Sequence, residues 1–116
     1  MDKIDLISKL KRYFGFSSFK GQQEDVINNL LEGNDTFVLM PTGGGKSLCY
    51  QIPALMFPGL TVVISPLIAL MKDQVDALRV NGIDAAYLNS TQSTSEQNEI
   101  MQRAQEKKLK LLYLAP

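Results

Sequence analysis

Short apolar runs alternate with stretches of helical periodicity along most of this chain. The four runs span residues 36–40, 60–64, 85–88 and 109–114. They lack the strict alternation of a half-solvated strand, so they predict strands covered on both faces. Helical spacing occupies residues 2–14, 26–31, 46–56, 67–80 and 93–106. Strands that alternate with helices predict an α/β fold, in which right-handed crossovers build a parallel sheet with helices on both faces.

Local signals mark where several of these helices begin and end. Gly33 stands where the second helix is expected to stop, because glycine favours the position after a helix. Ser93 and Glu96 have the spacing of a capping box at the start of the last helix. Pro53 is expected to kink or shorten the helix at 46–56, since proline has no N–H to donate.

Composition excludes several classes of protein. The chain has 116 residues, no His and one Cys, so it cannot contain a disulfide framework, a histidine-ligated zinc site or a His-based catalytic triad. Its apolar content of 45% argues against disorder. No apolar run reaches the roughly 18 residues of a membrane span, and the N-terminus does not resemble a signal peptide. We expect a folded, cytoplasmic chain no larger than one domain, with a helical region at 1–33 and an α/β core at 34–116.

The balance of charge limits how this chain could contact nucleic acid. It carries 12 basic and 12 acidic residues, and residues 1–50 and 51–116 are each balanced. A protein that binds nucleic acid through bulk electrostatics needs a strongly basic face. Any such contact is therefore expected to be local, at a loop or a helix end.

A glycine-rich segment lies between the first predicted strand and the helix that follows it. It consists of Met40, Pro41, Thr42, Gly43, Gly44, Gly45, Lys46 and Ser47. Consecutive glycines let backbone N–H groups curl around a polyphosphate, and the helix start adds its dipole. Lys46 can reach the β- and γ-phosphates, and the Ser47 hydroxyl can ligate Mg²⁺. This pattern predicts a P-loop, although Met40 replaces the usual first glycine. The alternative is a glycine-rich turn with an incidental lysine.

Four segments in and around this loop form a recognisable series. They are MPTGGGKSLCYQIPAL at 40–55, VISPLIALMKDQV at 63–75, LNSTQ at 88–92 and LYLAP at 112–116. Together they resemble RecQ-type DNA helicases of superfamily 2, and they look like a bacterial member. The resemblance implies that residues 1–116 are the N-terminal part of a first RecA-like motor domain, with a P-loop fold whose sheet is incomplete. It also implies binding of ATP with Mg²⁺ and 3′ to 5′ movement on single-stranded or branched DNA in repair and recombination, at the nucleoid for a bacterial member. It assigns catalytic roles to Lys46 and Ser47, with Ser47 as the Mg²⁺ ligand.

The resemblance also covers the segment upstream of the loop, where family members recognise adenine. By position, Phe16 would stack on the base while Lys20 and Gln23 hold it. A glutamine amide offers one donor and one acceptor, which fits the N6/N7 edge of adenine. The chain departs from the family in having Phe16 in place of Tyr, and Lys20-Gly21-Gln22 in place of Arg-Pro-Gly. The alternatives are a core aromatic at Phe16 and an exposed helix-opening residue at Gln23.

Two further segments resemble the family's DNA-backbone contacts. The residues concerned are Ser65, Pro66, Leu67 and Lys72 in one segment, and Asn89, Ser90 and Thr91 in the other. A helix start at Ser65 and Pro66 presents free N–H groups that could face a phosphate. The alternatives are a solvated lysine at Lys72 and an ordinary strand-to-helix turn at 89–91.

Groups that helicases need for ATP hydrolysis are absent from these 116 residues. The family's Asp-Glu-x-His box does not occur, and neither Arg12, Arg79 nor Arg103 lies in a motif typical of an arginine finger. We therefore expect the 116-residue chain alone to bind ATP without efficient hydrolysis, and to self-associate through exposed sheet edges. The alternatives are a stand-alone nucleotide- or DNA-binding module, or part of another superfamily 2 helicase or remodeller.

Overall fold

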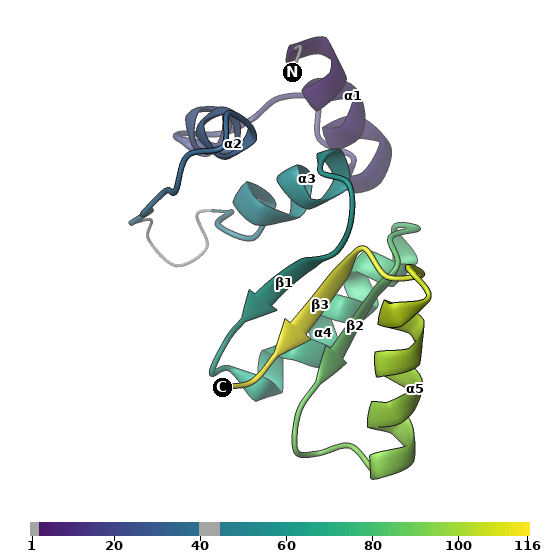
Figure 1. Ribbon diagram of the computed structural model, residues 1–116. Coiled ribbons are helices and arrows are strands. Elements are labelled where there is room, and N and C mark those ends of the chain that lie inside the picture. Colours follow the sequence, from purple (N-terminus) through teal and green to yellow (C-terminus); the bar gives the residue numbers. More distant parts are fainter. Residues whose placement is uncertain (1–2, 40–44) are drawn as a thin grey trace. The chain divides into compact units, whose positions relative to one another are not determined.

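The computed structural model describes residues 3–39 and 45–116. The chain forms two compact units, Met1–Pro58 and Gly59–Pro116 (Figure 1). Each unit has a hydrophobic core of its own. The boundary between the units lies after the third helix, so this helix belongs to the first unit together with the N-terminal helices.

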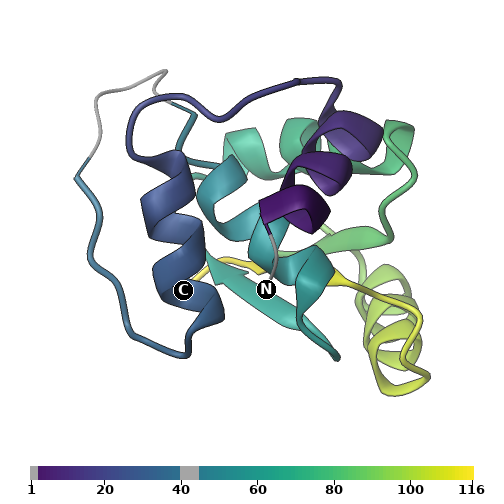
Figure 2. The ribbon, with the colours of Figure 1, turned by 90° about the horizontal axis from the view of Figure 1, so that it is seen from above.

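The first unit contains three helices. They are α1 (Lys3–Phe14), α2 (Gln23–Leu31) and α3 (Leu48–Met56). Helix α3 contacts both α1 and α2, and Figure 2 shows it lying between them. Four fully buried side chains join the three helices: Leu6, Leu10, Ile27 and Ile52. The apolar spacing of the sequence therefore predicts these helices correctly, and their buried stripes hold them together.

Helix α3 begins two residues later than the periodicity predicts. Lys46 and Ser47 form the turn that leads into it, and their carbonyls accept bonds from Cys49 N and Gln51 N, both at 3.0 Å. Pro53 lies inside the helix and is buried, and the helix ends at Met56. Burial also raises the pKa of the Cys49 thiol, so this side chain remains a neutral packing group.

The first predicted strand does not form in the part of the run that the structure describes. Thr36–Leu39 has no strand partner, and Phe37 and Leu39 are 88% and 81% exposed. Met40 lies outside the described residues. The prediction of a strand covered on both faces is therefore wrong for residues 36–39. The physical reason is the lack of a neighbour, because an extended segment becomes a strand only when another strand satisfies its N–H and C=O groups.

The second unit is built around a three-stranded parallel sheet. Its strands are β1 (Thr61–Ile64), β2 (Ala85–Leu88) and β3 (Leu111–Leu114), and its helices are α4 (Ile68–Val80) and α5 (Thr94–Gln105). The strand order is β1-β3-β2, so β3 is central, and Leu112 is in register with both Val62 and Ala86. The predicted α/β fold with a parallel sheet is thus confirmed in this unit.

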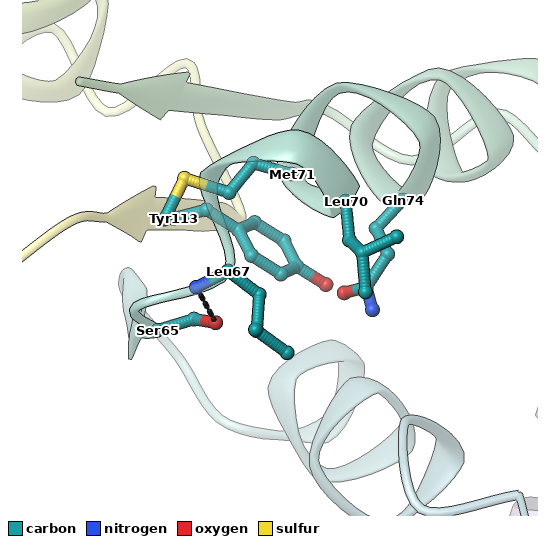
Figure 3. Close-up of a pocket in the computed structure, with 6 residues that line it drawn as sticks. All are labelled: Ser65, Leu67, Leu70, Met71, Gln74 and Tyr113. Carbon is teal, nitrogen blue, oxygen red and sulfur yellow. Dashed lines mark hydrogen bonds between the residues drawn. The ribbon is translucent and has the colours of Figure 1, made fainter. Parts of the chain in front are cut away.

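The two helices of this unit lie on opposite faces of the sheet (Figure 1). Ile100 of α5 packs against the cluster of Ala86 and Leu112 on one face. Met71 of α4 lies beside Tyr113 on the other face (Figure 3). Helix α5 covers β2 and β3 but does not cover β1. Ile64 of β1, on the same face of the sheet, is 69% exposed. The predicted arrangement, a parallel sheet with helices on both faces, is therefore confirmed in this unit.

The capping box that begins α5 is present as the sequence predicts. Glu96 N donates to Ser93 Oγ at 3.2 Å, and Ser93 N donates to Glu96 Oε1 at 3.3 Å. These bonds satisfy N–H groups that have no partner inside the helix. None of the helices within residues 3–39 and 45–116 is both long enough and apolar enough to cross a membrane.

Candidate nucleotide and nucleic-acid sites

Three residues of the predicted phosphate loop are described: Gly45, Lys46 and Ser47. The predicted ligands Met40, Pro41, Thr42, Gly43 and Gly44 lie outside the described residues. Gly45 has φ +78°, in the left-handed region that favours glycine. Lys46 is exposed, and Ser47 occupies the N-cap position of α3 without a side-chain capping bond. Both side chains therefore stand at the helix start in positions where a ligand could reach them.

Gln23 joins the upstream segment to this loop. Its side chain is 4% exposed, its Nε2 donates to Gly45 O at 3.1 Å, and its Oε1 accepts from Lys20 N at 2.8 Å. Gln23 opens α2, as one alternative reading of the sequence proposed, but it is buried and not exposed. The structure therefore brings the predicted adenine-binding segment against the predicted phosphate loop.

The other two predicted adenine contacts are accessible. Phe16 is 48% exposed, and Lys20 is exposed as well. Phe14 and Phe19, in contrast, are partly buried against the core of the first unit. The alternative that Phe16 is a core aromatic is therefore wrong, and its ring has a free surface on which a base could stack.

The described residues suit a magnesium nucleotide better than a metal held by the protein alone. Within them, no group of three or more His, Cys, Asp and Glu side chains could hold a metal ion. Mg²⁺ usually keeps several waters and binds through substrate phosphates with few protein ligands. A single hydroxyl at Ser47, which follows Lys46 in the sequence, fits that mode of binding.

Two segments predicted to contact DNA begin at one edge of the sheet in the second unit. Ser65 follows β1 and Asn89 follows β2, and the carboxyl ends of parallel strands share an edge (Figure 1). Ser65 N donates to Leu114 O at 3.0 Å, and Ala115 N donates to Leu88 O at 3.4 Å, so both segments are tied to β3 or its end. Topology thus gathers two candidate segments that lie far apart in the sequence.

The start of α4 is more fully bonded than the sequence predicts. Leu67 N donates to Ser65 Oγ at 3.1 Å, and Ile68 N donates to Pro66 O at 3.1 Å. These two N–H groups are therefore already used within the turn, and only their displacement would free them for a phosphate. Leu67 itself is 57% exposed, beside a small hollow lined also by Leu70, Met71, Gln74 and Tyr113 (Figure 3).

Lys72 is paired on the surface of α4. Its Nζ lies 2.7 Å from Asp76 Oδ2, and the two side chains are 67% and 47% exposed. The hydrogen bond and charge of Asp76 raise the pKa of Lys72, so the ammonium stays charged. Exposed pairs of this kind contribute little to stability. A nucleic-acid phosphate would compete with Asp76 for the lysine.

The Asn89 side chain stabilises the loop after β2. Its side chain is buried, and its Oδ1 accepts from Thr91 N at 2.9 Å and also from the Thr91 hydroxyl. Its Nδ2 lies 3.8 Å from Met71 Sδ. This arrangement is an Asx turn, which matches the alternative reading of an ordinary strand-to-helix turn. Ser90 and Thr91 are exposed, so these two residues are the accessible part of the segment.

Two glutamines that the sequence did not single out hold the same loop. Gln92 Nε2 donates to Tyr87 O at 2.8 Å, and Gln92 Oε1 accepts from Asn89 N at 3.1 Å. Gln97 Nε2 donates to Asn89 O at 3.0 Å. Gln92 ends the LNSTQ segment, but neither that segment nor any pattern at Gln97 shows that these side chains bond to the backbone of Tyr87 and Asn89.

Comparison with known proteins agrees with this geometry. The DEAD/DEAH box helicase family matches residues 20–116. The chain belongs to this family.

The similar curated proteins are more specific. The chain is 55% identical over 116 residues to the ATP-dependent DNA helicase RecQ of Haemophilus influenzae, covering all of this chain and 19% of that protein. It is 58% identical over 114 residues to RecQ of Pasteurella multocida, covering 98% and 18%. The ATP-dependent DNA helicase Q5 of Rattus norvegicus is 49% identical over 113 residues, covering 94% and 12%. The chain thus spans about a fifth or less of these relatives.

Proposed function

We propose that this chain is the ATP-binding part of a RecQ-type, ATP-dependent DNA helicase. Membership of the helicase family and the identity to RecQ proteins support this assignment. The observation that carries it is the bond between Gln23 and Gly45, which sets a base-reading amide against a phosphate loop 22 residues away. A nucleotide needs both features close together, since its base and its phosphates belong to one molecule.

The proposed roles in nucleotide binding follow the chemistry of each side chain. The loop from Met40 to Ser47 surrounds the phosphates, with Lys46 as their cation and the Ser47 hydroxyl as a ligand of Mg²⁺. Phe16 stacks on the adenine, and Lys20 and Gln23 hold its edge. Bound Mg²⁺ supplies positive charge to the transferred phosphoryl group. The residues of this chain bind and orient the nucleotide.

The proposed DNA contacts lie at the carboxyl edge of the sheet in the second unit. The proposed segments are Ser65 to Leu67 and Asn89 to Thr91, and Lys72 adds one positive charge. Ser90 and Thr91 are exposed, whereas the buried Asn89 side chain holds the turn that presents them. A local site of this kind fits the zero net charge, because the chain has no excess of basic residues. The proposal includes 3′ to 5′ action on single-stranded or branched DNA, in cytoplasmic repair and recombination. The bare β1 edge is the proposed surface for self-association.

Nucleotide binding tests this function directly. Affinity for a fluorescent ATP analogue, with Mg²⁺ present, should fall at least about tenfold in Lys46→Ala, because the lysine is the charge nearest the phosphates. Lys11→Ala is the matched control, since Lys11 is another exposed lysine in the first unit. Unchanged affinity in Lys46→Ala would refute the phosphate-loop assignment. The 116-residue chain should bind without efficient DNA-stimulated hydrolysis, because these residues lack the acidic box.

A further inference from the structure

The C-terminal half of α1 carries positive charge that the helix dipole explains only in part. From Lys9 to Lys20 the sequence has four basic residues and no acidic one, although the whole chain has zero net charge. Basic residues in the last turn of a helix interact favourably with its dipole, which explains Lys11 and Arg12. Lys9 lies before that turn, so the dipole gives no reason for its charge.

Lys9 and Arg12 both lie beside the ring of Tyr13. Lys9 stands three positions before Arg12 and four before Tyr13, a spacing that places side chains on one face of a helix. Lys9 Nζ is 5.7 Å from the centroid of the Tyr13 ring, and Arg12 Cζ is 5.2 Å from it. Both distances are within the range of a cation–π contact, so one ring holds two cations. We call these three side chains the Tyr13 cluster.

The positive charges of the Tyr13 cluster are not neutralised by the residues that the structure describes. None of those residues forms an ion pair with Lys9 or Arg12, whereas Lys72 and Lys108 each pair with an acidic side chain. Asp5 stands one turn before Lys9, at a spacing that allows an ion pair, but the two side chains form none. An ammonium and a guanidinium both carry several N–H donors, which an aromatic ring does not satisfy. The cluster therefore suits an anionic ligand.

Burial and charge favour the phosphates of a nucleic acid as that ligand. A membrane surface would need an apolar helix face beside the cations. Leu6 and Leu10, which form the apolar stripe of α1, are instead fully buried in the core of the first unit. A nucleic-acid strand presents a row of negative charges to neighbouring cations, and lysine and arginine are common partners of its phosphates.

We propose that the Tyr13 cluster is a second DNA-backbone contact of this chain, in the first unit and additional to the segments proposed in the second. Lys9 and Arg12 bind phosphates of a DNA strand, and Tyr13 is the positioning residue that holds the two cations near each other. The contact distinguishes no base sequence, because phosphate contacts carry no direct sequence information. This inference rests on the proposed function, since it takes DNA as the substrate.

Removing the two charges tests this contact. The probe is a fluorescent single-stranded oligo-dT, whose bases offer no adenine to the proposed nucleotide site. Its affinity, measured by anisotropy at low salt, should fall about tenfold when Lys9→Gln and Arg12→Gln are combined. The slope of log affinity against log salt should become shallower by about 1.4, at roughly 0.7 for each lost contact with a single strand.

A charge-matched control separates this contact from bulk electrostatics. Lys11→Gln combined with Lys107→Gln removes two positive charges from exposed lysines outside the cluster, and it should change oligo-dT affinity by less than about twofold. Lys9→Arg combined with Arg12→Lys keeps both charges and should also bind within about twofold of the unsubstituted chain. Circular dichroism verifies that each variant is folded.

Substitutions of Tyr13 test its positioning role. Tyr13→Leu keeps both cations but removes the ring, so oligo-dT affinity should fall about threefold. Tyr13→Phe keeps the ring and should leave affinity unchanged. Equal affinities in these two variants would overturn the positioning role of the ring.

Three outcomes would overturn the contact as a whole. They are unchanged oligo-dT affinity in the Lys9 and Arg12 double variant, equal weakening in its charge-matched control, and displacement of oligo-dT by poly-glutamate as effectively as by unlabelled oligo-dT at equal charge. The last would make the cluster a site for acidic peptides. A chain that bound the ATP analogue but not oligo-dT would refute this contact and leave the nucleotide site standing. A chain that bound neither would refute the proposed function itself.

Discussion

Two apolar runs of similar composition have different fates in this molecule. Residues 111–114 form the central strand of the second unit, and Leu111 is fully buried. Residues 36–39 belong to the first unit, form no strand, and expose Leu39 to 81%. Residues 111–114 have parallel partner strands on both sides, whereas residues 36–39 have no partner strand among the described residues. Strand structure is thus a property of neighbours as much as of the run itself.

The same contrast separates the two candidate sites. In the second unit, parallel pairing sets Ser65 and Asn89 at one edge, so backbone bonds of the sheet position them. In the first unit, a side chain positions the site, because Gln23 Nε2 donates a hydrogen bond to the Gly45 carbonyl. A site built on strand ends should tolerate surface substitutions. A site held by one buried amide should be sensitive to that amide.

Matched leucine truncations should give the largest difference between the two runs. Leu111→Ala is expected to lower the free energy of unfolding by about 2–5 kcal/mol, because it opens a cavity at a fully buried position. Leu39→Ala should change it by less than about 0.5 kcal/mol, since that side chain is exposed. Urea unfolding followed by circular dichroism measures both. Similar losses in the two variants would mean that residues 36–39 pair as a strand after all.

Within the strand-end site, alanine substitutions at Asn89 and Ser90 should also differ in their effect on stability, but by less than the two leucine truncations. Asn89→Ala is expected to cost about 1–3 kcal/mol of stability, because it leaves the Thr91 N–H without its acceptor. Ser90→Ala, at an exposed neighbour, should leave stability unchanged. Denaturant unfolding tests the pair. Asn89 would lose its assignment as the organiser of this turn if its replacement were as mild as that of Ser90.

The smallest expected effect concerns the surface pair on α4. Asp76→Asn should strengthen binding of a single-stranded oligonucleotide by less than about fivefold, because it releases Lys72 from an exposed ion pair. Asp73→Asn makes the same change of charge at a neighbouring exposed position and should do less. Fluorescence anisotropy at low salt measures both affinities.

The pH dependence of this pair follows from its pKa shift. Asp76 raises the pKa of Lys72, so the lysine keeps its charge at neutral pH and loses it as the pH rises through that raised pKa. The gain in Asp76→Asn should therefore be constant between about pH 6 and 8, well below the ordinary lysine pKa. A gain that varied across this range would show that another group controls it.

Much of the fold is predictable from local sequence. The helices at 3–14, 68–80 and 94–105 and the strand at 85–88 follow periodicity and caps, because these signals act between residues close in the chain. Resemblance to helicases indicates which residues to consider for each site. The resemblance does not show which backbone groups hold the Gln23 amide, or that the Asn89 side chain already bonds to Thr91 within its own turn.

The sequence by itself determined the alternation of helices and strands, the glycine-rich loop, and the absence of histidine and of the acidic box. Only the tertiary structure decided that residues 36–39 form no strand with any described residue, that strand ends bring Ser65 and Asn89 to one edge, and that Gln23 holds Gly45. The physical reason is the range of the interactions. Caps and periodicity depend on residues within a few turns, whereas strand pairing and a buried amide depend on partners that folding alone brings together.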